Sequence, residues 1–165
     1  LVFFAPSQTW QSVVSFISSI QIISLAFGPL ALLALRRTAP DVERGFRLPM
    51  AGVIGPIAFV AANVIVYWCG WETNRVCFGL LAGLGALFVV VHRLRNLAMP
   101  LDLRELRWMA PWMAVSAAIS WLGNFGGGVG AIPAGWDVVA IGVSSLLVMW
   151  IALRRPSTRL PERME

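Results

Sequence analysis

The sequence predicts an all-α integral membrane protein with about five transmembrane helices. Its 165 residues are 58% hydrophobic and only 13% charged. Its apolar stretches reach or approach the ~20 residues that a helix needs to cross a bilayer. All 13 basic residues are arginine, and twelve of them lie in two connections between apolar stretches and in the C-terminal tail. Short loops rich in Arg stay in the cytoplasm, so this distribution is typical of a membrane protein.

The apolar stretches define five expected spans of unequal length. The third and fourth are short for a bilayer, but flanking Arg and Trp side chains can reach the interface from them. Gly28-Pro29 and Gly55-Pro56 should bend the first and second spans, because proline removes a backbone hydrogen bond. In order, the expected spans are Trp10–Leu35, Met50–Gly70, Val76–Val91, Trp108–Leu122 and Trp136–Leu153.

The arginines predict the orientation of these spans. The connections after the first and third spans are basic and should be cytoplasmic, as should the tail from Arg154. The connections at residues 70–75 and 123–135 should lie outside; the second is rich in glycine and reads as a loop. The alternation holds along the whole chain. The expected topology anchors are Arg36, Arg37, Arg44, Arg47, Arg93, Arg95, Arg104, Arg107, Arg154 and Arg155.

The chain begins with Leu1-Val2-Phe3-Phe4 instead of Met, and we expect a fragment that starts at the end of an earlier span. Residues 1–9 would then hold the end of that span and an outer loop. The expected units that follow are 10–49 (first span and basic loop), 50–95 (second and third spans), 96–153 (fourth and fifth spans) and 154–165 (cytoplasmic tail).

The connection after the first span carries the most specific motif in the chain. It runs from Phe27-Gly28-Pro29 through Leu35-Arg36 and Pro40-Asp41 to Arg44-Gly45-Phe46-Arg47-Leu48-Pro49. This stretch resembles the amino acid permeases of the amino acid–polyamine–organocation (APC) superfamily, at the end of their tenth span. Gly45 stands where the family usually has Pro. The resemblance is good over about residues 1–60 and weak beyond, and a basic loop with two prolines also follows spans of other proteins.

The resemblance implies the C-terminal part of a LeuT-like (APC) transporter fold. The first expected span would be the tenth, and the last two would be extra, as in fourteen-span forms similar to aspartate–proton symporters. In that architecture the substrate binds at broken first and sixth spans, near the middle of the membrane. Those spans would lie in the remaining N-terminal part of the parent transporter. We therefore assign no substrate-binding residue here.

Polar residues of the first span leave two interpretations open. Gln11, Ser15, Ser18 and Ser19 recur at three- and four-residue steps and share a broad helix face. They could line the transport path, or they could form hydrogen bonds between packed helices, which is the more common use of such residues. Asn63 in the second span allows the same two interpretations. A hydrogen bond between helices is the favoured one, and contact with a water-filled path is the other.

The two cysteines and the absence of catalytic motifs limit the classes of function that the sequence predicts. Cys69 and Cys77 flank the connection at residues 70–75; two separate thiols are a commoner outcome than a bridge, since spacing alone does not establish connectivity. We find no Cys–His metal pattern, no catalytic triad and no phosphate loop with Lys, so we expect no enzyme, metal or cofactor. The net charge of +5 does not indicate nucleic acid, because the arginines flank apolar helices and suit an anionic bilayer surface.

The sequence thus predicts part of a secondary active transporter that carries amino acids across a bacterial cytoplasmic membrane. Alternating access, coupled to an ion and most simply to protons, would be its mechanism. This part would be mainly scaffold, because the sequence places no ionisable residue in the middle of a span. The alternative is a small stand-alone membrane protein with a structural or assembly role. The partners would be the lipid bilayer, the preceding spans and the amino acid substrate of the parent.

Overall fold

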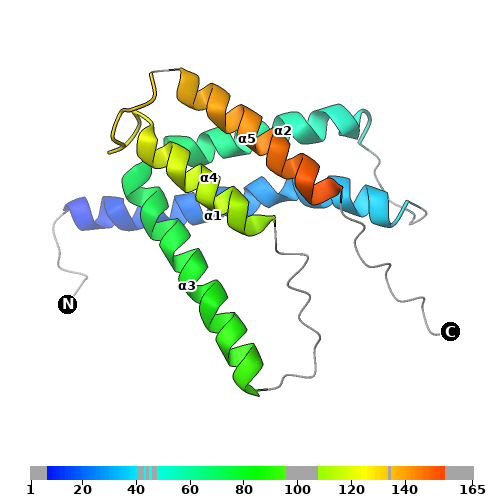
Figure 1. The fold of residues 1–165 in the computed structure, drawn as a ribbon, viewed down its shortest axis with the longest axis horizontal. Coiled ribbons are helices and arrows are strands. Elements are labelled where there is room, and N and C mark those ends of the chain that lie inside the picture. Colours follow the sequence, from blue (N-terminus) through cyan, green and yellow to red (C-terminus); the bar gives the residue numbers. More distant parts are fainter. Residues whose placement is uncertain are drawn as a thin grey trace.

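Five helices make up the computed structural model, which describes residues 7–40, 43, 45, 48–95, 108–133 and 135–154 (Figure 1). They are α1 (Ser7–Thr38), α2 (Ala51–Trp68), α3 (Trp71–Arg95), α4 (Met109–Leu122) and α5 (Trp136–Leu153). No strand occurs in the described residues. The all-α class predicted from the apolar stretches is therefore confirmed.

Four of the helices are long and apolar enough to cross a membrane by length and composition. The exception is α4, with 14 residues. At 1.5 Å per residue this helix is about 21 Å long, less than the ~30 Å of a hydrocarbon core. The expectation that the fourth span is short is thus confirmed. The third span was placed too narrowly, because α3 has 25 residues and begins at Trp71.

The early start of α3 corrects the predicted loop at residues 70–75. Only Cys69 and Gly70 separate α2 from α3, and residues 71–75 are the first five residues of α3. Gly70 adopts a positive φ of 83°, which turns the chain from α2 into the differently directed α3 within two residues (Figure 1). The polar residues Glu72, Thr73 and Asn74 predicted a loop. They instead belong to α3, because the turn between α2 and α3 is made by Gly70.

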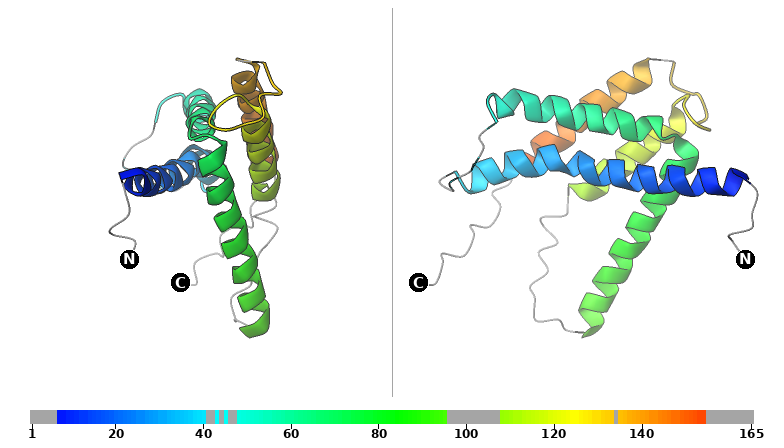
Figure 2. Two further views of the ribbon diagram at one scale, coloured as in Figure 1. Left: turned by 90° about the vertical axis from the view of Figure 1, so that its left-hand side faces the viewer. Right: turned by 180° about the vertical axis from the view of Figure 1, so that it is seen from behind.

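The two prolines inside helices do not end them. Pro29 lies within α1 and Pro56 within α2. The adjacent Gly55 serves close packing, because a Cβ atom there would lie 2.8 Å from Leu33 of α1. These two helices run antiparallel and form the most extensive contact between elements (Figure 2).

The core of the molecule is centred on Trp112 of α4, whose side chain is only 1% exposed. Its ring meets Phe27 of α1 at a centroid distance of 4.9 Å and Phe78 of α3 at 5.8 Å, both edge to face. Such aromatic pairs contribute roughly 0.5–1.5 kcal/mol beyond the area they bury. Trp112 therefore joins α1, α3 and α4 into one packed unit.

The second half of α3 leaves this unit. Figures 1 and 2 show α3 projecting away from the other helices. Cys77 and Phe78 near its start are buried, whereas most side chains from Ala82 to Val91 are exposed. Added Cβ atoms at Gly79, Gly83 and Gly85 would meet nothing within 4 Å. The face of α3 that carries these three glycines is thus uncovered within the described part of the chain.

Candidate functional site

Buried polar side chains gather where α2 and α4 end and where α3 and α5 begin. We call this region the glycine end; it comprises Tyr67, Gly70, Asn74, Ser120, Gly126 and Asp137. Buried polar groups in a membrane protein need hydrogen-bond partners, because no water in the hydrocarbon region can replace them. The partners of each group therefore decide whether any remains free to bind a substrate.

Asp137 is the one charged side chain that is buried in the described part of the chain, at 6% exposure. Its Oδ2 accepts a hydrogen bond from the hydroxyl of Tyr67 on α2. Its Oδ1 accepts hydrogen bonds from the backbone N–H groups of Gly135 (3.1 Å) and Val138 (2.8 Å) at the start of α5. The N-terminus of a helix also favours a negative charge. Both carboxylate oxygens thus have partners within the protein.

Asn74 forms the second contact of the glycine end. Its side-chain amide donates to the backbone carbonyl of Val66 on α2 (2.8 Å) and to the hydroxyl of Ser120 on α4 (3.1 Å). The residue is 1% exposed, and its Oδ1 has no hydrogen-bond partner among the described residues. One amide group therefore joins three helices. This residue was expected in an outer loop, and the expectation was wrong because α3 starts three residues earlier.

The loop between α4 and α5 closes the glycine end. Its backbone folds back on α4 through hydrogen bonds from Val129 to Trp121 and from Ala131 to Leu122. It also contacts the start of α3, since the N–H of Glu72 donates to the carbonyl of Gly126. A Cβ atom on Gly70 would lie 2.9 Å from the Cα of Gly126. The predicted glycine-rich loop is confirmed, and its glycines permit direct contact between two backbones.

Asn63 lies one helical turn before Tyr67 on α2 and is 2% exposed. Its Nδ2 donates to the carbonyl of Phe59 (2.8 Å) within α2, and its Oδ1 accepts from the indole N–H of Trp112 (2.7 Å) on α4. The predicted interhelical hydrogen bond is therefore confirmed. The side-chain amide of Asn63 therefore serves to hold α2 and α4 together.

The opposite end of the molecule is held by arginines. We call it the arginine end; it comprises Arg36, Arg37 and Arg154, where α1 and α5 end and α2 begins. Arg36 donates to the carbonyl of Leu48 (3.0 Å), just before α2. Arg37 donates to the carbonyl of Leu153 (2.9 Å) in the last turn of α5. A cation at a helix C-terminus satisfies a free carbonyl and favours the negative end of the helix dipole.

The other predicted anchors and path-lining residues are described only in part. Arg93 is exposed near the end of α3, away from the arginine end. Arg44, Arg47, Arg104, Arg107 and Arg155 and the side chain of Arg95 lie outside the described residues, as do the side chains of Gln11 and Ser15. Ser18 is exposed and Ser19 is buried at 3%. The path-lining role of this stripe stays a prediction.

Cys69 and Cys77 carry free thiols. The first follows α2 and donates to the carbonyl of Ile65 in the last turn of that helix, and the second is buried in the core. Two separate thiols were the preferred expectation. No group of three potential metal ligands occurs within the described ranges.

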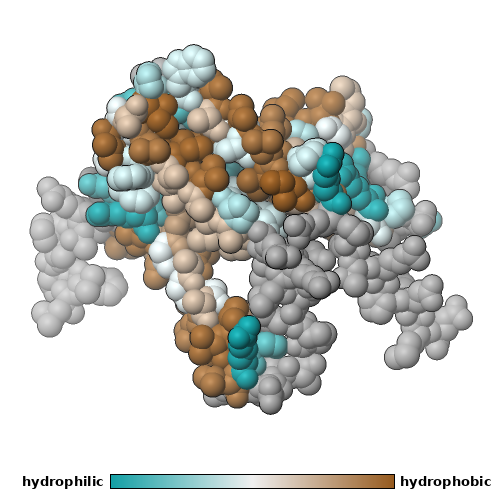
Figure 3. All heavy atoms as spheres, viewed as in Figure 1, coloured by the Kyte–Doolittle hydropathy of each residue, from teal (hydrophilic) through white to brown (hydrophobic). Residues whose placement is uncertain are grey.

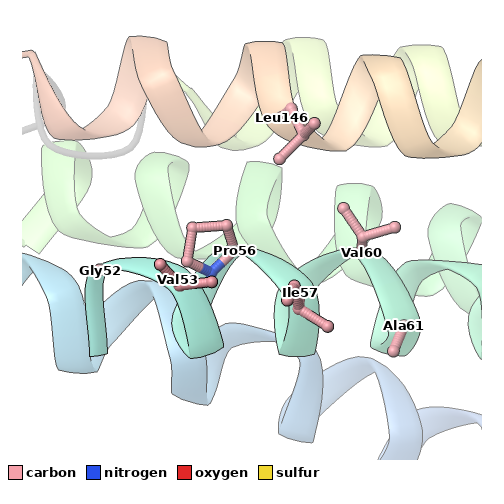
Figure 4. A pocket seen from close by; sticks show the side chains of 7 residues that line it. All are labelled: Gly52, Val53, Pro56, Ile57, Val60, Ala61 and Leu146. Carbon is pink, nitrogen blue, oxygen red and sulfur yellow. The ribbon is translucent and has the colours of Figure 1, made fainter. Parts of the chain in front are cut away.

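An apolar groove of about 570 Å³ lies on the surface between α2 and α5 (Figure 4). It runs along one face of α2 and meets α5 at a single residue. A free amino acid carries an ammonium and a carboxylate group, and this lining offers neither charge nor polar side chains. The groove therefore suits hydrocarbon. Its lining residues are Gly52, Val53, Pro56, Ile57, Val60, Ala61 and Leu146.

Sequence reasoning missed the contact between Tyr67 and Asp137. Asp137 directly follows Trp136 at a predicted helix start, which is an ordinary place for an acid. Tyr67 is the only tyrosine of the chain and lies one residue before the end of α2. A lone tyrosine near one span end and a lone acid near another were the available signal, but pairing them requires the arrangement of α2 against α5.

Two transporters of Bacillus subtilis are similar in sequence to most of this chain. The chain is 33% identical over 147 residues to the glutamate/serine transporter AimA of Bacillus subtilis (strain 168), covering 88% of this chain and 27% of that protein. It is 27% identical over 150 residues to the aspartate-proton symporter of the same strain, covering 89% of this chain and 29% of that protein. No family model matches the chain. No solved structure matches it.

The chain thus spans less than a third of the length of these two relatives. The likeness supports a relationship to amino acid transporters, and the four long apolar helices support an integral membrane protein. The resemblance seen in the motif after the first span is confirmed to that level. The fourteen-span form and the position of α1 as a tenth span stay predictions.

Proposed function

We propose that this chain is the C-terminal part of a secondary active transporter that moves amino acids across a bacterial cytoplasmic membrane by alternating access. The likeness to two amino acid transporters over almost nine-tenths of the chain carries this proposal. Both relatives are named for the transport of amino acids, and both names include an acidic one. An acidic amino acid, or serine, is therefore the substrate class to test first.

We further propose that this part is mainly scaffold. The only buried charge in the described residues, Asp137, accepts three hydrogen bonds from the protein. These hydrogen bonds occupy both carboxylate oxygens and hold the side chain between α2 and the start of α5, which is the arrangement of a structural group. Asn63 and the Asn74 amide nitrogen are likewise used between helices. Substrate and ion would bind on the remaining spans of the parent transporter, where the substrate carboxylate can meet helix N-termini.

Proton coupling is the form of energy supply that we propose, since one relative is named as a proton symporter. The orientation follows from charge: short arginine-rich connections remain in the cytoplasm, and each cation near an anionic surface gains about 1 kcal/mol. The arginine end and the C-terminal tail would face the cytoplasm. The glycine end would face outward. This arrangement agrees with α1, α2 and α5 alternating in direction.

Uptake into proteoliposomes tests the proposal. The parent transporter should accumulate radiolabelled aspartate, glutamate or serine when the outside is more acidic than the inside, and a protonophore should abolish accumulation. No uptake of any of the three by correctly inserted parent would contradict the transport proposal. Uptake that persists with the protonophore and follows a sodium gradient would contradict proton coupling.

The scaffold proposal has a separate test with the 165-residue chain alone. We expect this chain to insert into the membrane and to transport nothing. The parent transporter, reconstituted at equal density, serves as the matched control. Saturable uptake by the chain alone would contradict the scaffold role and would favour a complete small transporter.

A further inference from the structure

The arginine end brings three arginines together at the C-terminal ends of two helices. Arg36 and Arg37 lie in the last turn of α1, and Arg154 directly follows α5. The hydrogen bond from Arg37 to the Leu153 carbonyl joins the ends of the two helices. Arg154 is the next residue after Leu153, so all three arginines lie at this junction. Figure 3 shows hydrophilic residues gathered over this part of the molecule, directly beside hydrophobic surface.

The positive charge of this cluster is not balanced by the protein that the structure describes. Within the described ranges, no carboxylate forms an ion pair with these arginines. The guanidinium of Arg154 lies 3.5 Å from the centre of the Trp150 ring, so its contact is with an aromatic face. The Nε of Arg36 is buried and has no hydrogen-bond acceptor there. Each arginine has five N–H donors, and these contacts use one at most.

Apolar surface borders the cluster. Leu35 and Trp150 are 57% and 52% exposed, one turn or less from the arginines. The apolar groove between α2 and α5 starts at Gly52, four residues after the Leu48 carbonyl that Arg36 binds. It extends along α2 to Ala61, a distance of about 13 Å at 1.5 Å per residue. A charged site thus lies at the same end of α2 as the start of a hydrocarbon-compatible groove.

We propose that the arginine end binds the phosphate of an anionic phospholipid, with one acyl chain in the groove between α2 and α5. Guanidinium groups bind phosphate oxygens by charge-assisted hydrogen bonds, often in pairs. Free phosphate could form the same hydrogen bonds with the arginines, but it has no hydrocarbon part to fill the apolar groove. The combination of both features points to a lipid. This inference goes beyond transport, because the lipid would bind whether or not substrate moves.

The experiment measures lipid binding to the purified protein in neutral detergent, by native mass spectrometry with phosphatidylglycerol, phosphatidylcholine or inorganic phosphate added. The protein should retain phosphatidylglycerol in preference to phosphatidylcholine. Arg154→Gln should weaken phosphatidylglycerol binding roughly fivefold, the value of one cation at a membrane surface. Arg93→Gln removes the same charge from an exposed position near the end of α3, away from the arginine end, and should leave binding unchanged.

The groove has its own matched pair of variants. Gly52 and Gly79 are both helical positions at which an added Cβ atom meets nothing within 4 Å. Gly52→Leu places a side chain in the groove and should lower phosphatidylglycerol retention, whereas Gly79→Leu on α3 should not.

Three results would overturn the proposal. The first is equal loss of binding in Arg93→Gln and Arg154→Gln, which would indicate a diffuse basic surface. The second is displacement of phosphatidylglycerol by millimolar inorganic phosphate, which would indicate a free anion site. The third is full retention in both Arg154→Gln and Gly52→Leu. Since no transport is measured, these outcomes are independent of the proposed function.

Discussion

The two ends of this helical bundle are held together by different kinds of interaction. At the glycine end, two backbones touch at Gly70 and Gly126, and short side chains such as Asn74 and Asp137 form buried hydrogen bonds between helices. At the arginine end, the longer side chains of Arg36 and Arg37 reach backbone carbonyls from partly or fully exposed positions. One end depends on close packing and the other on charge.

This difference indicates which substitutions the chain should tolerate. Burial makes each contact at the glycine end costly to remove, because an unpaired polar group is left without water. Exposed cations at the arginine end keep access to water and lipid headgroups, so a lost contact there is partly replaced. We therefore expect stability to depend mainly on the glycine end and lipid response on the arginine end.

The largest expected effect comes from Gly70→Ala. The alanine must adopt a φ near 83°, which costs roughly 1–2 kcal/mol, and its Cβ atom would lie 2.9 Å from the Cα of Gly126. Overpacking of this kind adds about 1–3 kcal/mol. The free energy of unfolding in mixed micelles should fall by the sum. Gly79→Ala, in open space on α3, should be neutral or slightly stabilising, and a similar loss at both positions would contradict the packing argument.

The second effect concerns the hydrogen bond between Tyr67 and Asp137. A double-mutant cycle with Tyr67→Phe and Asp137→Ala isolates its energy. We expect a coupling free energy of about 1.5–3 kcal/mol, as for hydrogen bonds to a charged group. The measurement is the unfolding free energy of the four proteins. A coupling near zero would mean that the hydrogen bond between Tyr67 and Asp137 contributes nothing to stability.

The smallest effect is expected at the arginine end. Arg37→Gln removes a cation from the C-terminus of α5, and this should lower the unfolding free energy by about 0.3–1 kcal/mol. Because surface charge is screened, the effect should shrink as the salt concentration of the micelle solution rises. A loss as large as that from Asp137→Ala, independent of salt, would contradict the comparison between the two ends.

Much of the fold could be predicted because lipid restricts the choice of structure. Apolar length alone predicted five helices, and Asn63 predicted a hydrogen bond between them, since an amide inside a span needs a partner. The start of α3 could not be predicted in this way. Glu72 and Asn74 look like loop residues, and only the pairing of Asn74 with Ser120 shows why they continue a helix.

The candidate site was less predictable than the fold. The pair of Tyr67 and Asp137 joins residues 70 positions apart, and no local pattern records such a contact. The arginines were predicted as topology anchors from their distribution, but their gathering at the ends of α1 and α5 requires the tertiary arrangement. The projecting part of α3 also has no sequence signal, because an apolar helix reads the same whether or not a neighbour covers it.

The most direct test of the account is the side of the membrane on which each end lies. Single cysteines at Glu43 and Val129, both exposed, would be placed in a background without Cys69 and Cys77. On intact cells an impermeant thiol reagent should label the cysteine at position 129 and leave that at position 43 unlabelled until the membrane is opened. Labelling at position 43 in intact cells, with protection at position 129, would contradict the orientation and the assignment of the two ends.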